Sequence, residues 1–136
     1  MKKIAGLIAF VVFPAFTLLA SAFVFQGSDD AARGVAIELF KSLDEQQKSE
    51  ALKAFDDKDR FSEVFPAVER KGLAISKLKP EQAALVEKMI LAMTSPYGAS
   101  RCIEVAKQTP PNRRYINFFG TPEAGKSFAF RLAQHH

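Results

Sequence analysis

Apolar residues recur at three- and four-residue intervals in the first half of the chain. This spacing predicts one amphipathic helix over residues 28–43. Ser42 and Glu45 form an S-x-x-E pattern, so we expect a capping box there and a second helix that ends near Phe55. The inner faces of these two helices carry Ala32, Val35, Ala36, Leu39, Phe40, Leu43, Gln47, Ala51 and Phe55.

Two further helices are expected between residues 80 and 107. Pro80 suits a first helical turn, because its missing N–H group would have no partner there. The residues SPYG, 95–98, are expected to end this helix, and another follows over residues 99–107. The buried positions expected on the two helices are Leu85, Val86, Met89, Ile90 and Met93, then Ala99, Cys102, Ile103 and Ala106.

The hydrophobic period changes after the two prolines at 110–111. Residues 115–119 (YINFF) are β-prone, and from Phe128 onward apolar residues occupy every second position, which predicts a β-hairpin. The segment 61–78 is expected to be irregular. The chain is therefore predicted to form an α+β domain over residues 28–136, with about four amphipathic helices followed by a C-terminal hairpin.

The first residues have the pattern of an export signal. Lys2 and Lys3 precede an apolar stretch, and the small residues at 20–22 (ASA) suit signal peptidase, so we expect a signal peptide over residues 1–22. The alternative is an uncleaved membrane anchor over residues 4–25, which is long enough to span a bilayer. The protein is expected to be exported, periplasmic or extracellular, or else anchored in the inner membrane with its domain outside the cytoplasm.

The charge balance argues against a nucleic-acid partner. The chain of 136 residues has a formal net charge of +4, to which Lys2 and Lys3 of the expected signal contribute. The remaining basic clusters, Arg70-Lys71 and Arg113-Arg114, are too small to form the concentrated basic face that nucleic-acid binding needs. We therefore expect no nucleic acid, and contact with a membrane only through the N-terminal segment if that segment is not cleaved.

Neither the single cysteine nor a group of aspartates predicts a reactive site. Cys102 cannot form an intrachain disulfide, and its place on an apolar helix face predicts a buried, inert thiol. Three aspartates lie close together in FDDKDRF, without the glycine and distal glutamate of a calcium loop. We expect these aspartates, Asp56, Asp57 and Asp59, to cap or solvate a turn.

The stretch GTPEAGKS matches the phosphate-binding pattern G-x-x-x-x-G-K-[ST] through Gly120, Gly125, Lys126 and Ser127. Such a loop joins a strand to a helix whose N-terminus holds the phosphates. Here an alternating strand pattern follows, and Glu123 places a carboxylate inside the loop. We therefore expect a hairpin turn rather than a nucleotide-binding site.

Five stretches occur in an order that resembles the bacterial, usually exported family known as domain of unknown function 3500. They are FDDKDRF (55–61), RKGL (70–73), PEQ (80–82), YINFFGTP (115–122) and FAFRLAQHH (128–136). The last is similar to a family strand with the pattern W-G-W-R-x-E-G-H-H. In this chain phenylalanines replace both tryptophans, Ala129 replaces the first glycine, and Ala133-Gln134 replaces the Glu-Gly pair.

The resemblance implies that the chain is the N-terminal part of a larger domain, because members are generally more than twice as long and continue as a β-rich region. An incomplete domain would leave the C-terminal strand exposed, which makes self-association through this strand one expected partner mode. The family has no assigned activity, so we expect an exported protein without an assignable reaction and predict no cofactor.

Two alternatives to a noncatalytic protein stay open. The first is an exported metal-binding protein or hydrolase-type enzyme that uses His135 or His136, with Arg131 as a further candidate catalytic residue. Neighbouring strand residues point to opposite faces, so the two histidines cannot both serve one ordinary metal centre. The second alternative is a nucleotide binder that uses Lys126.

Overall fold

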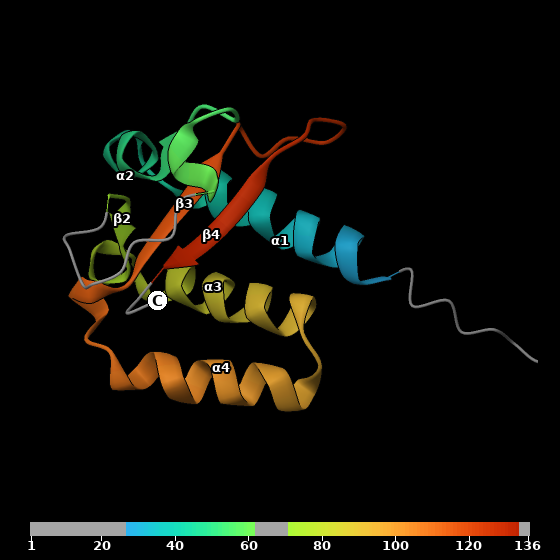
Figure 1. Ribbon diagram of the computed structural model, residues 1–136, viewed down its shortest axis with the longest axis vertical. Coiled ribbons are helices and arrows are strands. Elements are labelled where there is room, and N and C mark those ends of the chain that lie inside the picture. Colours follow the sequence, from blue (N-terminus) through green and yellow to red (C-terminus); the bar gives the residue numbers. More distant parts are fainter. Residues whose placement is uncertain (1–26, 62–70, 134–136) are drawn as a thin grey trace, which may run out of the picture.

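The computed structural model describes residues 27–61 and 71–133 (Figure 1). These residues form four α-helices, four strands and three short 3-10 helices, which confirms the predicted α+β class. The elements are α1 (Gly27–Ser42), α2 (Glu45–Ala51), β1 (Leu52–Lys53), η1 (Lys58–Phe61), β2 (Leu73–Ala74), η2 (Ile75–Lys77), α3 (Pro80–Met93), α4 (Pro96–Gln108), η3 (Pro111–Arg113), β3 (Tyr115–Phe119) and β4 (Ala129–Ala133).

The predicted helices exist, and several of their boundaries differ from expectation. Ser95 was expected to help end the third helix, but its hydroxyl accepts a hydrogen bond from the backbone N–H of Gly98 at 3.1 Å and caps α4. Pro96 therefore occupies the first turn of α4, three residues before the expected start of that helix.

The second boundary concerns the start of α2. The expected capping box of Ser42 and Glu45 is wrong, because Asp44 and Gln47 form it instead. The Asp44 carboxylate accepts from the Gln47 N–H at 2.8 Å, and the Gln47 side-chain carbonyl accepts from the Asp44 N–H at 3.0 Å. Ser42 donates its hydroxyl proton to the carbonyl of Leu39.

A buried amide pair explains why Gln47 takes this position. The side chains of Gln47 and Gln82 donate to one another at 3.0 Å, so the starts of α2 and α3 are held together. Gln82 also donates to the Ser42 carbonyl at 2.7 Å, at the end of α1. Three helix ends thus meet at one pair of buried amides whose hydrogen bonds are satisfied within the protein.

All three other strands of the described sheet pair with β3. β4 runs antiparallel to it over all five residues, and the parallel β1 and antiparallel β2 each pair with two residues. Since β4 fills one edge of β3, β1 and β2 share the other edge. The predicted hairpin is confirmed, whereas β1 and β2 were missed. β1 ends the second helix at Ala51 rather than near Phe55, and β2 lies in the segment expected to be irregular.

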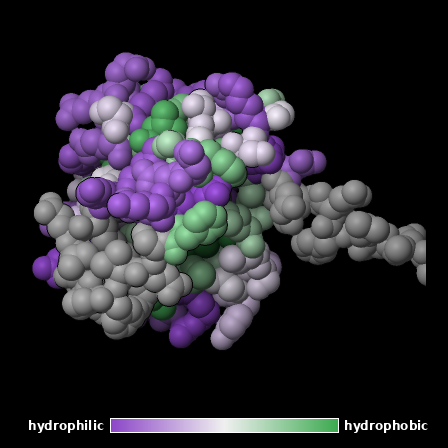
Figure 2. Space-filling view, turned by 45° about the horizontal axis from the view of Figure 1, so that its top comes forward, coloured by the Kyte–Doolittle hydropathy of each residue, from purple (hydrophilic) through white to green (hydrophobic). Residues whose placement is uncertain are grey.

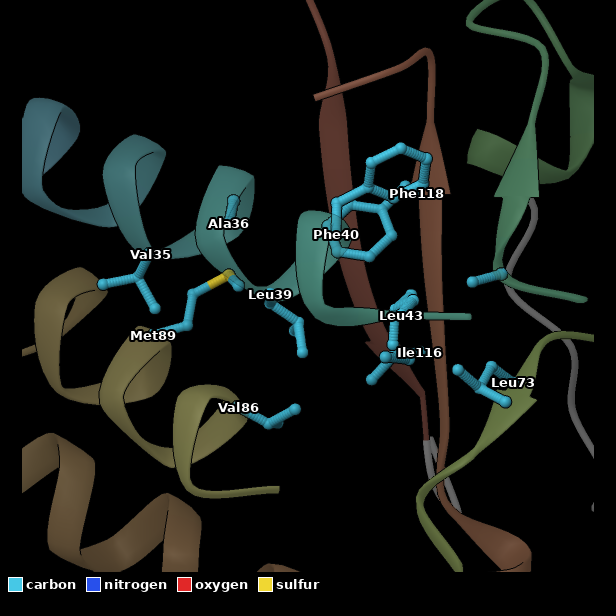
Figure 3. Packing of buried hydrophobic residues seen from close by; sticks show 11 residues of the cluster. Val35, Ala36, Leu39, Phe40, Leu43, Leu73, Val86, Met89, Ile116 and Phe118 are labelled. Carbon is cyan, nitrogen blue, oxygen red and sulfur yellow. The ribbon is translucent and has the colours of Figure 1, made fainter. Parts of the chain in front are cut away.

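The hydrophobic core lies between one face of this sheet and the helices α1 and α3 (Figure 3). Leu39 and Phe40 of α1 meet Met89 of α3 and Phe118 of β3, and the rings of Phe40 and Phe118 pack edge to face at 5.3 Å. In Figure 1, α3 lies between α1 and α4, so α4 is the helix farthest from α1.

Gly72, immediately before β2, is required where the chain passes over the other face of the sheet. Its φ is +145°, and a Cβ atom there would lie 2.7 Å from Nδ2 of Asn117 and 2.9 Å from the Ile116 carbonyl oxygen. Gly34, in the middle of α1, has no atom within 4 Å of the corresponding position.

We therefore predict opposite effects of alanine at these two glycines. Gly72→Ala should lower the free energy of unfolding by about 1–3 kcal/mol because of backbone strain and the clash with Asn117. Gly34→Ala should raise it by up to about 1 kcal/mol, since alanine favours a helix interior. Urea unfolding followed by circular dichroism measures both, and equal tolerance of the two substitutions would contradict the structure around Gly72.

Candidate functional site

Strand β4 separates two surfaces of different chemistry. Phe130 and Leu132 pair in register with the core residues Phe118 and Ile116 and point toward the helices. Arg131 lies between them in sequence, so its side chain is on the opposite face, where it is in register with Asn117. β4 therefore presents apolar side chains on one face and a cation on the other.

Arg131 joins β4 to the segment that precedes the second strand. Its guanidinium donates to the side-chain carbonyl of Asn117 at 3.3 Å and to the backbone carbonyl of Asp59 in η1. The same guanidinium lies 5.0 Å from the centre of the buried Phe119 ring, within the range of a cation–π contact. Three segments far apart in sequence are thus held together at Arg131.

Asp59 of η1 places a carboxylate beside Lys53 on this face. Lys53 of β1 places its ammonium nitrogen 2.7 Å from the carboxylate, and this hydrogen bond and charge hold the pKa of Asp59 below its ordinary value. The charges of Lys71 and Arg131 lower the pKa of Asp59 further, while burial opposes the shift. Next to Asp59, the Arg60 guanidinium lies over the Phe55 ring.

The side chains Lys53, Asp59, Arg60, Asn117 and Arg131 form what we call the cationic cluster. Three of them are cations and one is a carboxylate. Asn117 Nδ2, Arg131 Nε and Arg60 Nε are buried and have no acceptor among the residues that the structure describes. Because three cations face one carboxylate, the cluster favours additional negative charge nearby.

On its other face β4 borders an apolar groove. Two adjoining hollows, of about 470 and 310 Å³, share Met89, Met93 and Phe130 in their lining. The larger lies between α3, α4 and β4, and the smaller lies between α1, α3 and the hairpin. The residues that we call the groove are Met89, Ile90, Met93, Val105, Phe130 and Leu132.

The groove exists because the helices extend farther than the sheet. Within the described ranges β4 pairs with β3 alone, so the sheet ends at β4. The helical layer has one more element, because α4 packs against α3 (Figure 1). Met93 and Val105 are consequently 60% and 45% exposed. The space-filling view shows exposed hydrophobic residues among a mostly hydrophilic surface (Figure 2).

Cys102 lies at this groove and not in the core. The expectation of a buried thiol is wrong, because the buried residues of α4 are Ala99 and Ala106 while Cys102 is exposed. The expected burial of Met93 is wrong for the same reason. Helical spacing identified the apolar face of α4, and the described part of the sheet does not reach far enough to cover that face.

The phosphate-loop pattern forms a hairpin turn, as expected. Gly120 and Gly125 adopt φ values of +79° and +75°, and the loop runs directly into β4 at Ala129 instead of a helix. The Lys126 ammonium lies 2.7 Å from the Glu123 carboxylate within the same loop. The geometry needed to hold phosphates at a helix N-terminus is therefore absent after this loop, and the nucleotide alternative is not supported.

The remaining candidate residues form no metal centre in the part of the chain that is described. Asp57 accepts from the Asp59 N–H at 2.8 Å, so the aspartate group stabilises a turn. No group of three or more His, Cys, Asp or Glu side chains that could hold a metal occurs among residues 27–61 and 71–133. His135 and His136 lie outside the described residues.

The expected signal over residues 1–22 and the alternative anchor over 4–25 also lie outside the described residues. None of the helices in the described part of the chain is long and apolar enough to cross a membrane.

One residue of this site, Asn117, could have been recognised from its polar side chain within an apolar strand. Asn117 stands in the middle of the apolar run YINFF, and a polar residue at such a position needs a partner inside the protein. Lys53 had no such signal, because its partner Asp59 follows a turn whose path the sequence pattern did not define.

The fold and site define a small α+β domain in which the outer edge of β4 has no strand partner among the described residues and lies between a cationic cluster and an apolar groove. The chain belongs to the family described as Protein of unknown function (DUF3500), whose model matches residues 26–136. This confirms the family resemblance, and the family description assigns no specific activity. No curated protein and no solved structure is significantly similar to the chain.

We predict that Lys53 controls the ionisation of Asp59. Lys53→Met should raise the pKa of Asp59 toward its ordinary value, which carboxyl carbon NMR measures directly in a pH titration. Lys48→Met removes an ion pair with Glu45 elsewhere on the surface and should leave the Asp59 titration unchanged.

The ion pair of Lys53 and Asp59 also makes the stability of the protein depend on pH. Because the pKa of Asp59 is lowered in the folded protein, its stabilising contribution is present at neutral pH and is lost as the pH falls through that lowered pKa, below about 4. The stability difference between the parent and Lys53→Met should therefore shrink between pH 7 and pH 3. A difference that is independent of pH would show that Lys53 acts by packing alone.

Proposed function

We propose that this chain is an exported, noncatalytic interaction domain that receives an extended polypeptide segment along β4. One observation carries the proposal: the described sheet ends at β4 directly beside an apolar groove that α3 and α4 leave uncovered. A strand added at this edge would extend the sheet and cover the groove in one step.

The physical basis is the unpaired edge of β4. Alternate residues of an edge strand direct their N–H and C=O groups away from the sheet, where an incoming strand can pair with them. Backbone hydrogen bonds would supply affinity, and apolar side chains of the incoming strand would enter the groove formed by Met93, Val105 and Leu132. Pairing of this kind needs no catalytic group.

Export is part of the proposal and follows from the first residues of the sequence. We expect the N-terminal segment to carry the domain out of the cytoplasm. Alkaline phosphatase fused after residue 136 should be active in intact bacteria, because this reporter folds only outside the reducing cytoplasm. The same fusion to residues 27–136 is the control and should be inactive, and an inactive full-length fusion would contradict export.

Binding can be measured with a synthetic extended peptide that alternates valine with glutamine and carries one tryptophan. The protein contains no tryptophan, so a change in tryptophan emission reports the peptide alone. We predict saturable binding that Met93→Glu weakens about tenfold, because a carboxylate in the groove would have to be desolvated.

Leu91→Glu is the matched control for this substitution. Leu91 lies on α3 and is 54% exposed, similar to Met93 at 60%, but it is not part of the groove. It should leave binding unchanged. Equal loss of affinity in both variants, or no saturable binding by the parent protein, would contradict the proposed docking surface.

A further inference from the structure

We infer that the segment received by β4 alternates apolar residues with aspartate or glutamate, and that it comes from a protein other than a second copy of this chain. The inference rests on the proposed function and adds the chemistry of the partner. It depends on the two faces of β4, on the charge of the cationic cluster and on the position of Arg131 within the strand.

The two faces of β4 require alternation in the partner. A residue directly opposite Phe130 or Leu132 would point to the helix face, over the groove, and must be apolar to fill it. The residue between them would lie opposite Arg131, on the face of the cationic cluster. A strand with an apolar–polar–apolar pattern therefore matches β4.

The charge of the cluster selects a carboxylate at the central position of that pattern. Lys53, Arg60 and Arg131 outnumber Asp59, the single carboxylate of the cluster, so the cluster carries a net positive charge. Opposite charges on directly opposed strand residues attract, whereas a lysine opposite Arg131 would be repelled.

The same residue argues against pairing between two copies. Arg131 is the central residue of Ala129–Ala133, so the antiparallel two-fold register that pairs all five residues places Arg131 opposite its own copy. Like charges so placed are destabilising. A shift of register by two residues avoids this contact but leaves only three residues of each strand paired.

Three matched peptides test the inference on the full chain. They alternate valine with glutamine, carry one tryptophan, and differ only at a central residue that is glutamate, glutamine or lysine. We expect the glutamate peptide to bind about tenfold more tightly than the lysine peptide, with the glutamine peptide between them. Peptide binding should also slow the reaction of Cys102 with a thiol reagent, because this sole cysteine lies at the groove.

Two further measurements assign the preference to Arg131. Arg131→Gln should remove most of the difference between the glutamate and lysine peptides. For the unmodified protein, the difference in affinity between the glutamate and lysine peptides should shrink as the sodium chloride concentration rises from about 0.05 to 0.5 M, since salt screens exposed charges. The salt series tests the inference even if Arg131→Gln fails to fold.

The outcomes separate the two proposals. Equal affinity for all three peptides, with Cys102 protected, would overturn the acidic partner and leave the docking function intact. Absence of binding by every peptide would overturn the docking function itself. Concentration-dependent dimerisation of the protein in analytical ultracentrifugation, abolished by Met93→Glu, would overturn the argument against a second copy.

Discussion

The five residues of β3 hold the described parts of the molecule together, because β1, β2 and β4 all pair with them. Ile116 and Phe118 face the helices and form the centre of the core, while Asn117 and Phe119 face the cationic cluster. A strand that is buried on both faces must be covered from two directions. Helices α1 and α3 cover one face, and the side chains of β1, η1 and β4 cover the other.

The same arrangement explains why, among the described strands, the outer edge of β4 has no partner. β1 and β2 together fill one edge of β3, and β4 fills the other, so the described sheet is complete around its central strand. The helical layer extends farther than the described sheet, because α4 packs against α3 beyond β4. The groove beside β4 and the exposure of Met93 follow from this mismatch in width.

Local sequence signals were sufficient to predict that the four helices and the hairpin exist. Apolar periodicity located α1 and α3, and the change of period located β3 and β4. β1 and β2 could not be found in this way, because two-residue strands carry no period. The Ser42–Glu45 pattern predicted the wrong capping box for α2, because the contact of Gln47 with the distant Gln82 forms only in the folded chain.

The candidate site was predictable only in part. Arg131 was predicted only as a candidate catalytic residue, which stays a prediction, and its partners Asn117 and Asp59 belong to segments that only the folded chain brings together. The burial predicted for Cys102 was wrong because helical spacing identifies an apolar face without showing what covers it. The partners of Arg131 and the exposure of Cys102 both depend on contacts between distant parts of the chain, which local sequence patterns do not show.

The central claim is that the outer edge of β4 is open, and amide hydrogen exchange followed by NMR tests it most directly. An edge strand should have alternate amides that are protected by β3 and alternate amides that exchange rapidly with solvent. All amides of β3 that pair within the sheet should exchange slowly. Uniformly slow exchange along Ala129–Ala133 would show that the edge is already covered and would contradict the account.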